Sequence, residues 1–208
     1  MYIPKHFKVN DFSEIEAFIR EHSFGTLITT KKGKPIATHL PMQLCKKENK
    51  YYITGHMAYG NPQWKTFKTC EDVLITFQGP HAYISSSWYE KENVPTWNYQ
   101  SVHVYGKAYI LEEKELKDDL TYLLQKYEKH RPDPVLWDTL SPSLLEKELK
   151  GIVGFKVQVN EIQAAYKMSQ NRNKDDYENI IMQLQNEGNP ESSKMAERMK
   201  SKNLNMRE

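Results

Sequence analysis

The spacing of hydrophobic residues switches between helical and extended periods along the chain, and these switches predict its secondary structure. Near the N-terminus, Ile15 and Ile19 repeat at helical spacing behind Ser13, and Glu16 stands three residues after that serine. This arrangement matches a capping box, in which the serine and the glutamate satisfy free backbone amides at the start of a helix. We therefore expect the first helix to begin at Ser13.

Stretches rich in β-branched and aromatic residues follow, with turn residues between them. Such stretches favour strands. The expected strands are residues 24–30, 35–42, 51–54, 73–77, 82–84, 102–111 and 153–159. The sequence KKGK at 31–34 predicts a hairpin turn, and Gly79-Pro80 is expected to separate two strands. So many hairpin-linked strands indicate a closed or nearly closed antiparallel barrel.

Helices are predicted on either side of the last strand. Asn61-Pro62 resembles an N-cap followed by a proline at the first helical position. Longer amphipathic helices are expected over residues 116–127, after Ser141-Pro142 and over 177–184. The polar segment 191–208, whose larger apolar residues include Met199, predicts a marginal helix that packs on a partner subunit or frays. These patterns predict two parts, a barrel domain (1–172) and a helical C-terminal tail (173–208).

Composition and charge exclude several classes of function. Among 208 residues, 29 basic and 27 acidic side chains nearly balance, so no strong field points to a nucleic acid or a membrane. The N-terminus has no apolar signal region and no apolar run approaches membrane-spanning length, so we expect a cytoplasmic protein without a membrane partner. Cys45 and Cys70 are expected to be buried free thiols, and the seven histidines show no metal-ligand spacing.

Residues 81–105 combine six aromatic side chains with two histidines, three consecutive serines and several amides. Aromatic faces beside hydroxyl and amide groups suit a flat small-molecule ligand. The alternative is that the aromatics only fix long loops onto the barrel. Loops of this length in compact domains are usually functional or disordered, and this segment is too aromatic to be disordered.

Three polar stretches could bind a phosphate group on such a ligand. Thr54–His56 ends an expected strand, Ser85–Ser87 follows another, and Gln170–Arg172 lies after the last one. A phosphate needs amide or hydroxyl donors and a cation, often beside the N-terminus of a helix. Serine and asparagine runs usually only form turns, so the three stretches together favour a phosphate-bearing aromatic ligand more than any one alone.

Several long motifs resemble the PaiB family of bacterial transcriptional regulators, a branch of the FMN-binding split-barrel fold. The motifs are MYIPKHF at 1–7, THLPM at 38–42, TGHMAYGNPQW at 54–64, GPHAYISSSWY at 79–89, VPTWNYQSVHVYGKA at 94–108, HRPDPVLWD at 130–138, GIVGFKVQV at 151–159 and KMSQNR at 167–172. The resemblance covers about residues 1–175. It implies a six-stranded antiparallel split barrel with flanking helices, and a homodimer with a flavin phosphate site in the groove between subunits.

The resemblance also implies a set of residues that bind the cofactor. The candidates are His39, Thr54, His56, Asn61, Trp64, Trp97, Asn98, Gln100 and Arg172. Trp97, Asn98 and Gln100 would approach the flavin from the partner subunit, and Arg172 would bind its phosphate. Two alternatives stay open, namely that His39 is a satisfied core histidine and that Arg172 pairs with Asp175 or Asp176.

The resemblance implies a negative regulator of transcription that binds FMN or a related ligand. No helix-turn-helix and no basic stripe is visible, so contact with promoter DNA could be direct or indirect. One alternative is an FMN-dependent oxidoreductase, similar to pyridoxamine-phosphate oxidases or flavin reductases, although no dedicated acid and base stand out. Another is a heme protein, with an axial ligand among four histidines, His39, His56, His81 and His103.

Overall fold

The computed structural model describes the backbone of residues 1–205 and the side chains of residues 1–202. The chain divides into two compact units. Unit 1 comprises residues 1–18, 77–103 and the part from 163 onward, and unit 2 comprises residues 19–76 and 104–162.

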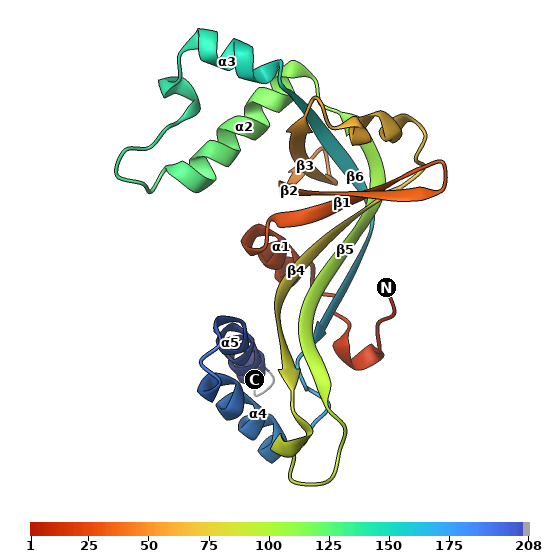
Figure 1. Cartoon of the computed structure of the whole chain (residues 1–208), viewed down its shortest axis with the longest axis vertical. Coiled ribbons are helices and arrows are strands. Elements are labelled where there is room, and N and C mark those ends of the chain that lie inside the picture. Colours follow the sequence, from red (N-terminus) through yellow and green to blue (C-terminus); the bar gives the residue numbers. More distant parts are fainter. Residues whose placement is uncertain (206–208) are drawn as a thin grey trace. The chain divides into compact units, whose positions relative to one another are not determined.

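Six antiparallel strands close into a barrel in the order β1–β2–β3–β6–β5–β4 (Figure 1). The strands are β1 (Phe24–Lys31), β2 (Lys34–Lys47), β3 (Lys50–Ala58), β4 (Val73–Ile84), β5 (Thr96–Ile110) and β6 (Ile152–Lys167). The fold is therefore the split barrel that the sequence predicted.

Five α-helices and four short 3-10 helices complete the described structure. The α-helices are α1 (Phe12–Glu21), α2 (Glu113–Glu128), α3 (Pro142–Leu149), α4 (Lys174–Asn186) and α5 (Pro190–Asn205). The 3-10 helices are η1 (Lys5–Phe7), η2 (Pro62–Lys68), η3 (Ser86–Trp88) and η4 (Trp137–Thr139). Among the described residues, no helix combines the length and the apolar character needed to span a membrane.

The first hairpin and η2 agree with the sequence prediction. Lys32 and Gly33 join β1 to β2, and both have positive φ angles, 51° and 77°, as a tight hairpin turn requires. The side chain of Asn61 accepts a hydrogen bond from the amide of Gln63 and so caps η2, with Pro62 at its first position. These turns and caps were predictable because each depends on two or three neighbouring residues.

The start of α1 differs from the prediction. The N-terminal cap is the carboxylate of Asp11, which accepts hydrogen bonds from the backbone amide (2.9 Å) and the hydroxyl (2.7 Å) of Ser13. These two bonds lower the pKa of Asp11. The expected capping by Ser13 is therefore wrong: α1 begins at Phe12, so Ser13 lies within its first turn and its own amide and hydroxyl donate to the carboxylate of Asp11.

Most strands are longer than the sequence indicated, and β4 and β5 differ most from the expected layout. β4 continues through Gly79-Pro80 as one strand from Val73 to Ile84, so the expected break there is wrong. A Cβ atom at Gly79 would lie only 2.6 Å from Cε2 of Phe18, so glycine serves close packing at this position instead of a turn. β5 begins at Thr96, inside the segment expected to be an aromatic loop.

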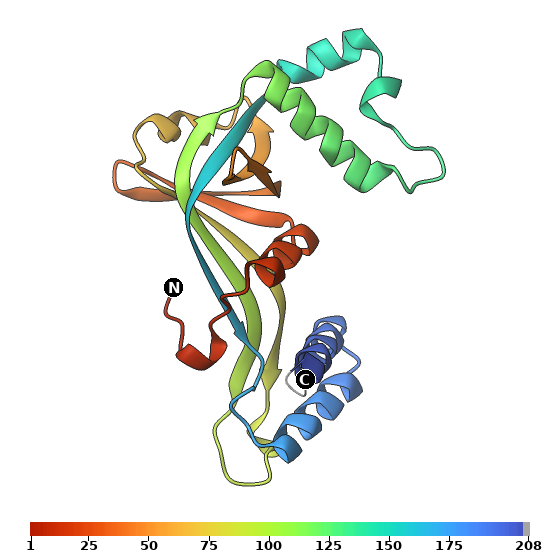
Figure 2. The same cartoon turned by 180° about the vertical axis from the view of Figure 1, so that it is seen from behind.

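The two C-terminal helices of unit 1 pack against each other (Figure 2). Met195, Ala196 and Met199 on α5 are fully buried, and the hydroxyl of Tyr177 on α4 donates to the carbonyl of Met199 at 2.8 Å. α5 is thus an ordered helix as far as Asn205, whereas the sequence suggested a marginal one. Residues 206–208 of the predicted tail lie outside the described residues, and the expected domain boundary after residue 172 stays a prediction.

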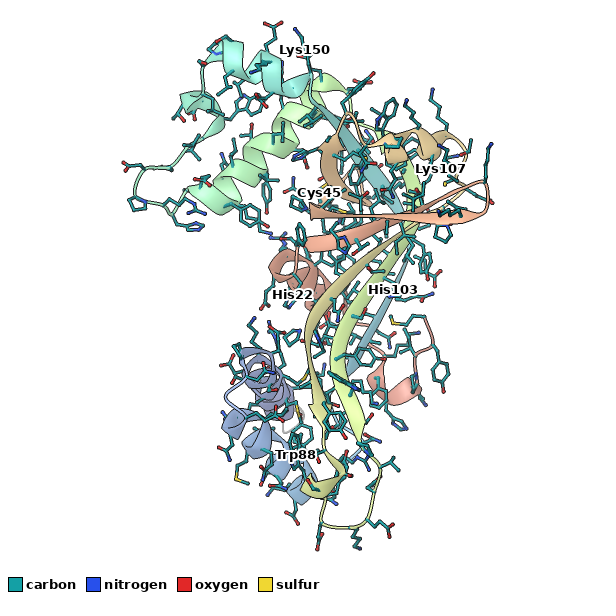
Figure 3. All side chains as sticks on the ribbon, viewed as in Figure 1. His22, Cys45, Trp88, His103, Lys107 and Lys150 are labelled. Carbon is teal, nitrogen blue, oxygen red and sulfur yellow. The ribbon has the colours of Figure 1, made fainter. Side chains whose placement is uncertain are left out.

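A second contact joins α4 to the segment before β5. Asn179 on α4 donates to the backbone carbonyl of Trp88 at 2.6 Å, and Trp88 is labelled in Figure 3. The carboxylate of Asp176 accepts from the amide of Glu90 at 2.9 Å. The aromatic segment is therefore tied to α4 by polar contacts within unit 1.

Unit 1 is expected to lose stability in alkaline solution. Burial raises the pKa of Tyr177 to about 12, from an ordinary value of 10.0. Below pH 10 the phenol is neutral in both the folded and the unfolded chain. As pH rises from 10 to 12 the unfolded chain ionises first, so the free energy of unfolding should fall by roughly 2 to 3 kcal/mol. Urea denaturation at pH 9 and pH 12 checks this, and an identical decline in Tyr177→Phe would contradict it.

Candidate functional site

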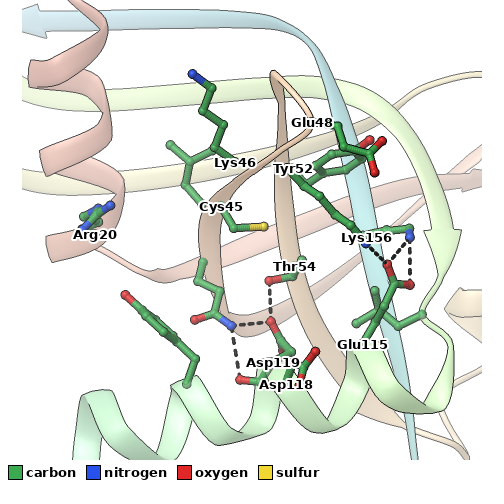
Figure 4. A pocket seen from close by; sticks show the side chains of 15 residues that line it. Arg20, Cys45, Lys46, Glu48, Tyr52, Thr54, Glu115, Asp118, Asp119 and Lys156 are labelled. Atoms are coloured by element: carbon green, nitrogen blue, oxygen red, sulfur yellow. Dashed lines mark hydrogen bonds and ion pairs between the residues drawn. The ribbon is translucent and has the colours of Figure 1, made fainter.

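A hollow of about 670 Å³ opens in unit 2 beside α2 and the outer face of β2 and β3 (Figure 4). This volume lies within the usual range of small-molecule pockets. Strand alternation decides which side chains line it. Leu44 and Ile53 point into the barrel and are buried, while the paired residues Gln43 and Thr54 face the hollow. A small-molecule ligand could therefore lie outside the barrel, against this face.

A carboxylate on α2 bridges the two strands beneath the hollow. Asp119 accepts hydrogen bonds through Oδ1 from the hydroxyl of Thr54 and from Nε2 of Gln43. Its other oxygen, Oδ2, is buried and has no hydrogen-bond partner among the described residues. The network fixes α2 to the barrel and holds Thr54, one of the predicted cofactor residues, in a single orientation.

Two lysines at the far side of the hollow share one carboxylate. Nζ of Lys156 lies 2.6 Å from Oε1 of Glu115, and Nζ of Lys47 lies 3.2 Å from the same oxygen. The hydrogen bond from Lys156 is the main reason why the pKa of Glu115 is lowered. A phosphate at this point would compete with a carboxylate that already pairs with both cations. Four basic and four acidic side chains line the hollow, so it has no excess of positive charge and suits a neutral or hydrogen-bonding ligand part better than a phosphate.

The thiol in the hollow is not activated. Burial, and then the charge of Asp119, raises the pKa of Cys45, so at neutral pH the residue is a thiol and not a nucleophilic thiolate. Cys45 as a whole residue is exposed and Cys70 is half-buried, so the expectation of two buried thiols is wrong. Among the described residues, no cluster of three or more histidine, cysteine or acidic side chains could hold a metal ion.

Unit 1 contains a different kind of polar group, two cations without acidic partners. Nζ of Lys167, at the end of β6, donates to the hydroxyl of Thr96 and lies 5.9 Å from the ring centroid of Phe7. The guanidinium of Arg172 stacks on Tyr89, 4.5 Å from its ring centroid. Within the described part of the chain, neither cation forms an ion pair with a carboxylate. The alternative that Arg172 pairs with Asp175 or Asp176 is therefore wrong.

Comparison with known proteins gives the family. A family model described as "Putative FMN-binding domain" matches residues 1–161. Over 202 residues the chain is 68% identical to protease synthase and sporulation protein PAI 2 of Bacillus subtilis, covering 97% of this chain and 98% of that protein. This chain belongs to the PaiB family.

Solved structures share the PaiB fold at low sequence identity. Flavocytochrome Anf3 of Azotobacter vinelandii superposes with a TM-score of 0.63 and 14% identity, over 85% of this chain and 78% of that one. The FAD and heme binding protein of Mycobacterium smegmatis gives a TM-score of 0.59 and 11% identity, over 82% and 78% of the two chains. At such identities the similarity shows the fold alone.

The candidate cofactor-binding residues in unit 2 lie either on the strands β2 and β3 or in η2 and its cap. Thr54 and His56 alternate with buried residues of β3 and so share its outer face, and His39 on β2 is exposed and stacks on Phe24, with ring centroids 6.4 Å apart. His39 is therefore not a core histidine. Asn61 and Trp64 make structural contacts in η2 and its cap.

The remaining candidates lie in unit 1, on opposite faces of β5 or after β6. Trp97 is 53% exposed and contacts the rings of His81 and Tyr83, whereas Asn98 and Gln100 point inward and are buried. The side-chain amide of Asn98 donates to the hydroxyl of Ser169 at 2.9 Å, and Ser169 lies three residues before Arg172 in the sequence. β5 thus brings Asn98 and Gln100 together on one face and places Trp97 on the other.

Three residues of these two sites were not among the candidates predicted from the sequence. Gln43 and Asp119 carry no local signal, because their partnership exists only when α2 packs on the barrel. Lys167 is the first residue of KMSQNR, one of the motifs that resemble the PaiB family. Its position two residues before the polar Ser169-Gln170 turn was the signal that could have identified it.

Proposed function

We propose that this protein is an FMN-binding negative regulator of transcription, acting as a homodimer in which FMN or a related flavin is the sensed ligand. Membership of the PaiB family and the match to an FMN-binding domain over residues 1–161 support this proposal. FMN supplies redox chemistry to a protein that binds it, and here the protein would bind and orient the flavin.

Unsatisfied polar atoms are the observation that carries the proposal. Nδ1 of His56 and Oε1 of Gln100, both candidate cofactor residues, are buried and have no hydrogen-bond partner among the described residues. Burial also lowers the pKa of His56, so its imidazole is neutral at pH 7 and has one acceptor nitrogen. Buried polar groups in native proteins are almost always satisfied, so atoms left free are places where a ligand's donors fit.

The decisive experiment is a titration of the purified protein with FMN, followed by visible absorption and tryptophan fluorescence. Saturable binding with quenching is expected for the wild type. Gln100→Leu should weaken FMN binding roughly ten-fold, because an acceptor for the ligand is lost. Its melting temperature should stay equal or rise, because the change also removes an unsatisfied buried polar group. Absence of any flavin binding by the wild type would overturn the proposed ligand.

The homodimer is proposed because the outward side of β4 and β5 carries exposed aromatic rings. Trp97 lies 5.9 Å from Tyr83 and 6.1 Å from His81, measured between ring centroids. Exposed apolar clusters of this kind mark interaction surfaces. Sedimentation velocity tests the proposal, and a wild-type monomer at micromolar concentration would contradict it. A salt-dependent gel shift with promoter DNA would separate direct from indirect regulation.

Heme is the second candidate ligand, and the observation that favours it is a histidine without a hydrogen-bond partner. Nδ1 of His103 on β5 is buried without a hydrogen-bond partner in the described structure, and burial lowers the pKa of this residue. A neutral imidazole is the form that binds iron. The absorption spectrum of the same sample distinguishes the two cofactors, because heme gives a Soret band and flavin does not. Turnover of NAD(P)H by the flavin-loaded protein would favour the oxidoreductase alternative.

A further inference from the structure

Asp119, on α2 beside the hollow of unit 2, has one carboxylate oxygen without a partner. The residue is only 7% exposed, and Oδ1 accepts from both Thr54 and Gln43 (Figure 4), whereas Oδ2 is buried and accepts from no described residue. Buried polar atoms in native proteins are almost always hydrogen-bonded, and an ionised carboxylate accepts at both oxygens. Oδ2 is therefore an acceptor for which a ligand can supply the donor.

The carboxylate of Asp119 also lacks a cation. No ion pair joins it to a basic side chain in the part of the chain that the structure describes, and two lysines of the same hollow, Lys47 and Lys156, contact Glu115 instead. A buried carboxylate without a positive neighbour costs free energy, because its charge is removed from water. A cationic donor would offset that cost, whereas a neutral donor would satisfy only the hydrogen bond.

The hollow has room for such a group, and its electrostatics reflect Asp119. Burial, and then the charge of Asp119, raises the pKa of Cys45, which lines the hollow. A separate void of about 10 Å³ also lies against Asp119. That void is at the lower limit of the roughly 10 to 15 Å³ that one water needs, and water brings no positive charge. Only the hollow, at about 670 Å³, is large enough for an organic cation.

The walls of the hollow suit an aromatic body next to the cationic group. Tyr52 and Tyr122 contribute rings, and Leu111 contributes an aliphatic side chain. Tyrosine rings attract cations through their faces, and they also pack against flat ligands. An arylalkyl amine combines the two parts that these walls and Asp119 recognise.

We propose that the hollow in unit 2 binds a small organic cation, an arylalkyl amine whose ammonium group donates to Oδ2 of Asp119. Oδ2 is covered in the structure, so the contact requires a small shift of the side chains around it. Thr54 and Gln43 hold Oδ1 and are positioning residues. The site goes beyond the proposed flavin function and does not rest on it, since Thr54 is the only candidate cofactor residue among those that line the hollow.

The probe for this site is benzylamine, which is a cation at neutral pH, and benzyl alcohol is its neutral counterpart with the same ring. Binding to the full-length protein is read by mass spectrometry as protection of Cys45 from methyl methanethiosulfonate, a thiol-specific reagent. Cys70 is the internal reference, because it does not line the hollow. Benzylamine should protect Cys45 saturably and bind about ten-fold or more tightly than benzyl alcohol, since only the amine supplies a charge.

Asp119→Asn is the variant that tests the contact. Its amide oxygen can still accept from Thr54 and Gln43, while an NH₂ group replaces Oδ2, so the charge and the free acceptor are both lost. Benzylamine binding should weaken by on the order of ten-fold or more, with circular dichroism confirming the fold. Glu113→Gln is the matched control, because it removes an equal charge from α2 at a residue that lies outside the hollow and pairs with Lys117. The control should bind benzylamine like the wild type.

Three results would overturn the amine site. They are no protection of Cys45 by millimolar benzylamine, equal affinity of the wild type for benzylamine and benzyl alcohol, and equal benzylamine affinity of the wild type and Asp119→Asn. Displacement of benzylamine by FMN would also overturn a separate site, because the hollow would then belong to the flavin, whereas simultaneous binding of both would support it. A wild type that binds benzylamine but no flavin would support this site and overturn the proposed function.

Discussion

Asp119→Ala is expected to lower the free energy of unfolding by about 2 to 4 kcal/mol, because it removes the carboxylate oxygen that accepts from Thr54 and Gln43. Thr54 is buried, so water cannot fully replace its lost acceptor, whereas Nε2 of Gln43 keeps a longer bond to the backbone carbonyl of Asp119, 3.3 Å. The side-chain link from α2 to β3 would also be lost. Urea denaturation followed by circular dichroism measures the change.

Two variants make this result specific. Asp118→Ala removes the adjacent acid, which is exposed and lines the same hollow, and should change stability by less than about 0.5 kcal/mol. Asp119→Asn keeps one acceptor oxygen for Thr54 and Gln43 and should recover part of the loss. Equal stability of the Asp118 and Asp119 variants would show that the bridge contributes little.

The sequence predicted the local features of the fold because these depend on few neighbouring residues. The hairpin at Lys32-Gly33 and the cap at Asn61 depend on a glycine, which adopts a positive φ angle without steric cost, and on an asparagine, which is a preferred cap residue. β4 was divided wrongly because Gly79-Pro80 is a turn signal in isolation, whereas pairing and the ring of Phe18 decide the outcome in the folded chain. Long strands gain their stability from partners that no local window contains.

The candidate site shows the same division between local and distant signals. Motifs identified Thr54 and Arg172, and the structure gives each a defined setting, one beside Asp119 and the other on Tyr89. Asp119 could not be chosen from the many acids of α2, because its role arises only from the depth at which the helix packs. That Lys167 contacts Thr96 and forms no ion pair with the described residues is likewise a property of three-dimensional surroundings and not of sequence neighbours.

The cations of the two units differ in their partners. In the hollow of unit 2, Lys47 and Lys156 both contact Glu115. In unit 1, Lys167 and Arg172 form no ion pair with a carboxylate of the described residues and contact Thr96 and Tyr89 instead.

Gly106→Ala is expected to destabilise the barrel by about 3 kcal/mol or more, because the new methyl group has no space. A Cβ atom at this position would lie 1.9 Å from the carbonyl oxygen of Gln158 and 2.9 Å from its carbon. Both are backbone atoms of β6, so relief requires β5 and β6 to move apart, whereas a side chain could simply rotate. Gly60→Ala is the control, since nothing lies within 4 Å of its Cβ position. The measurement is the melting temperature of both variants. A Gly106→Ala protein as stable as Gly60→Ala would show that β5 and β6 are not in close contact at this point.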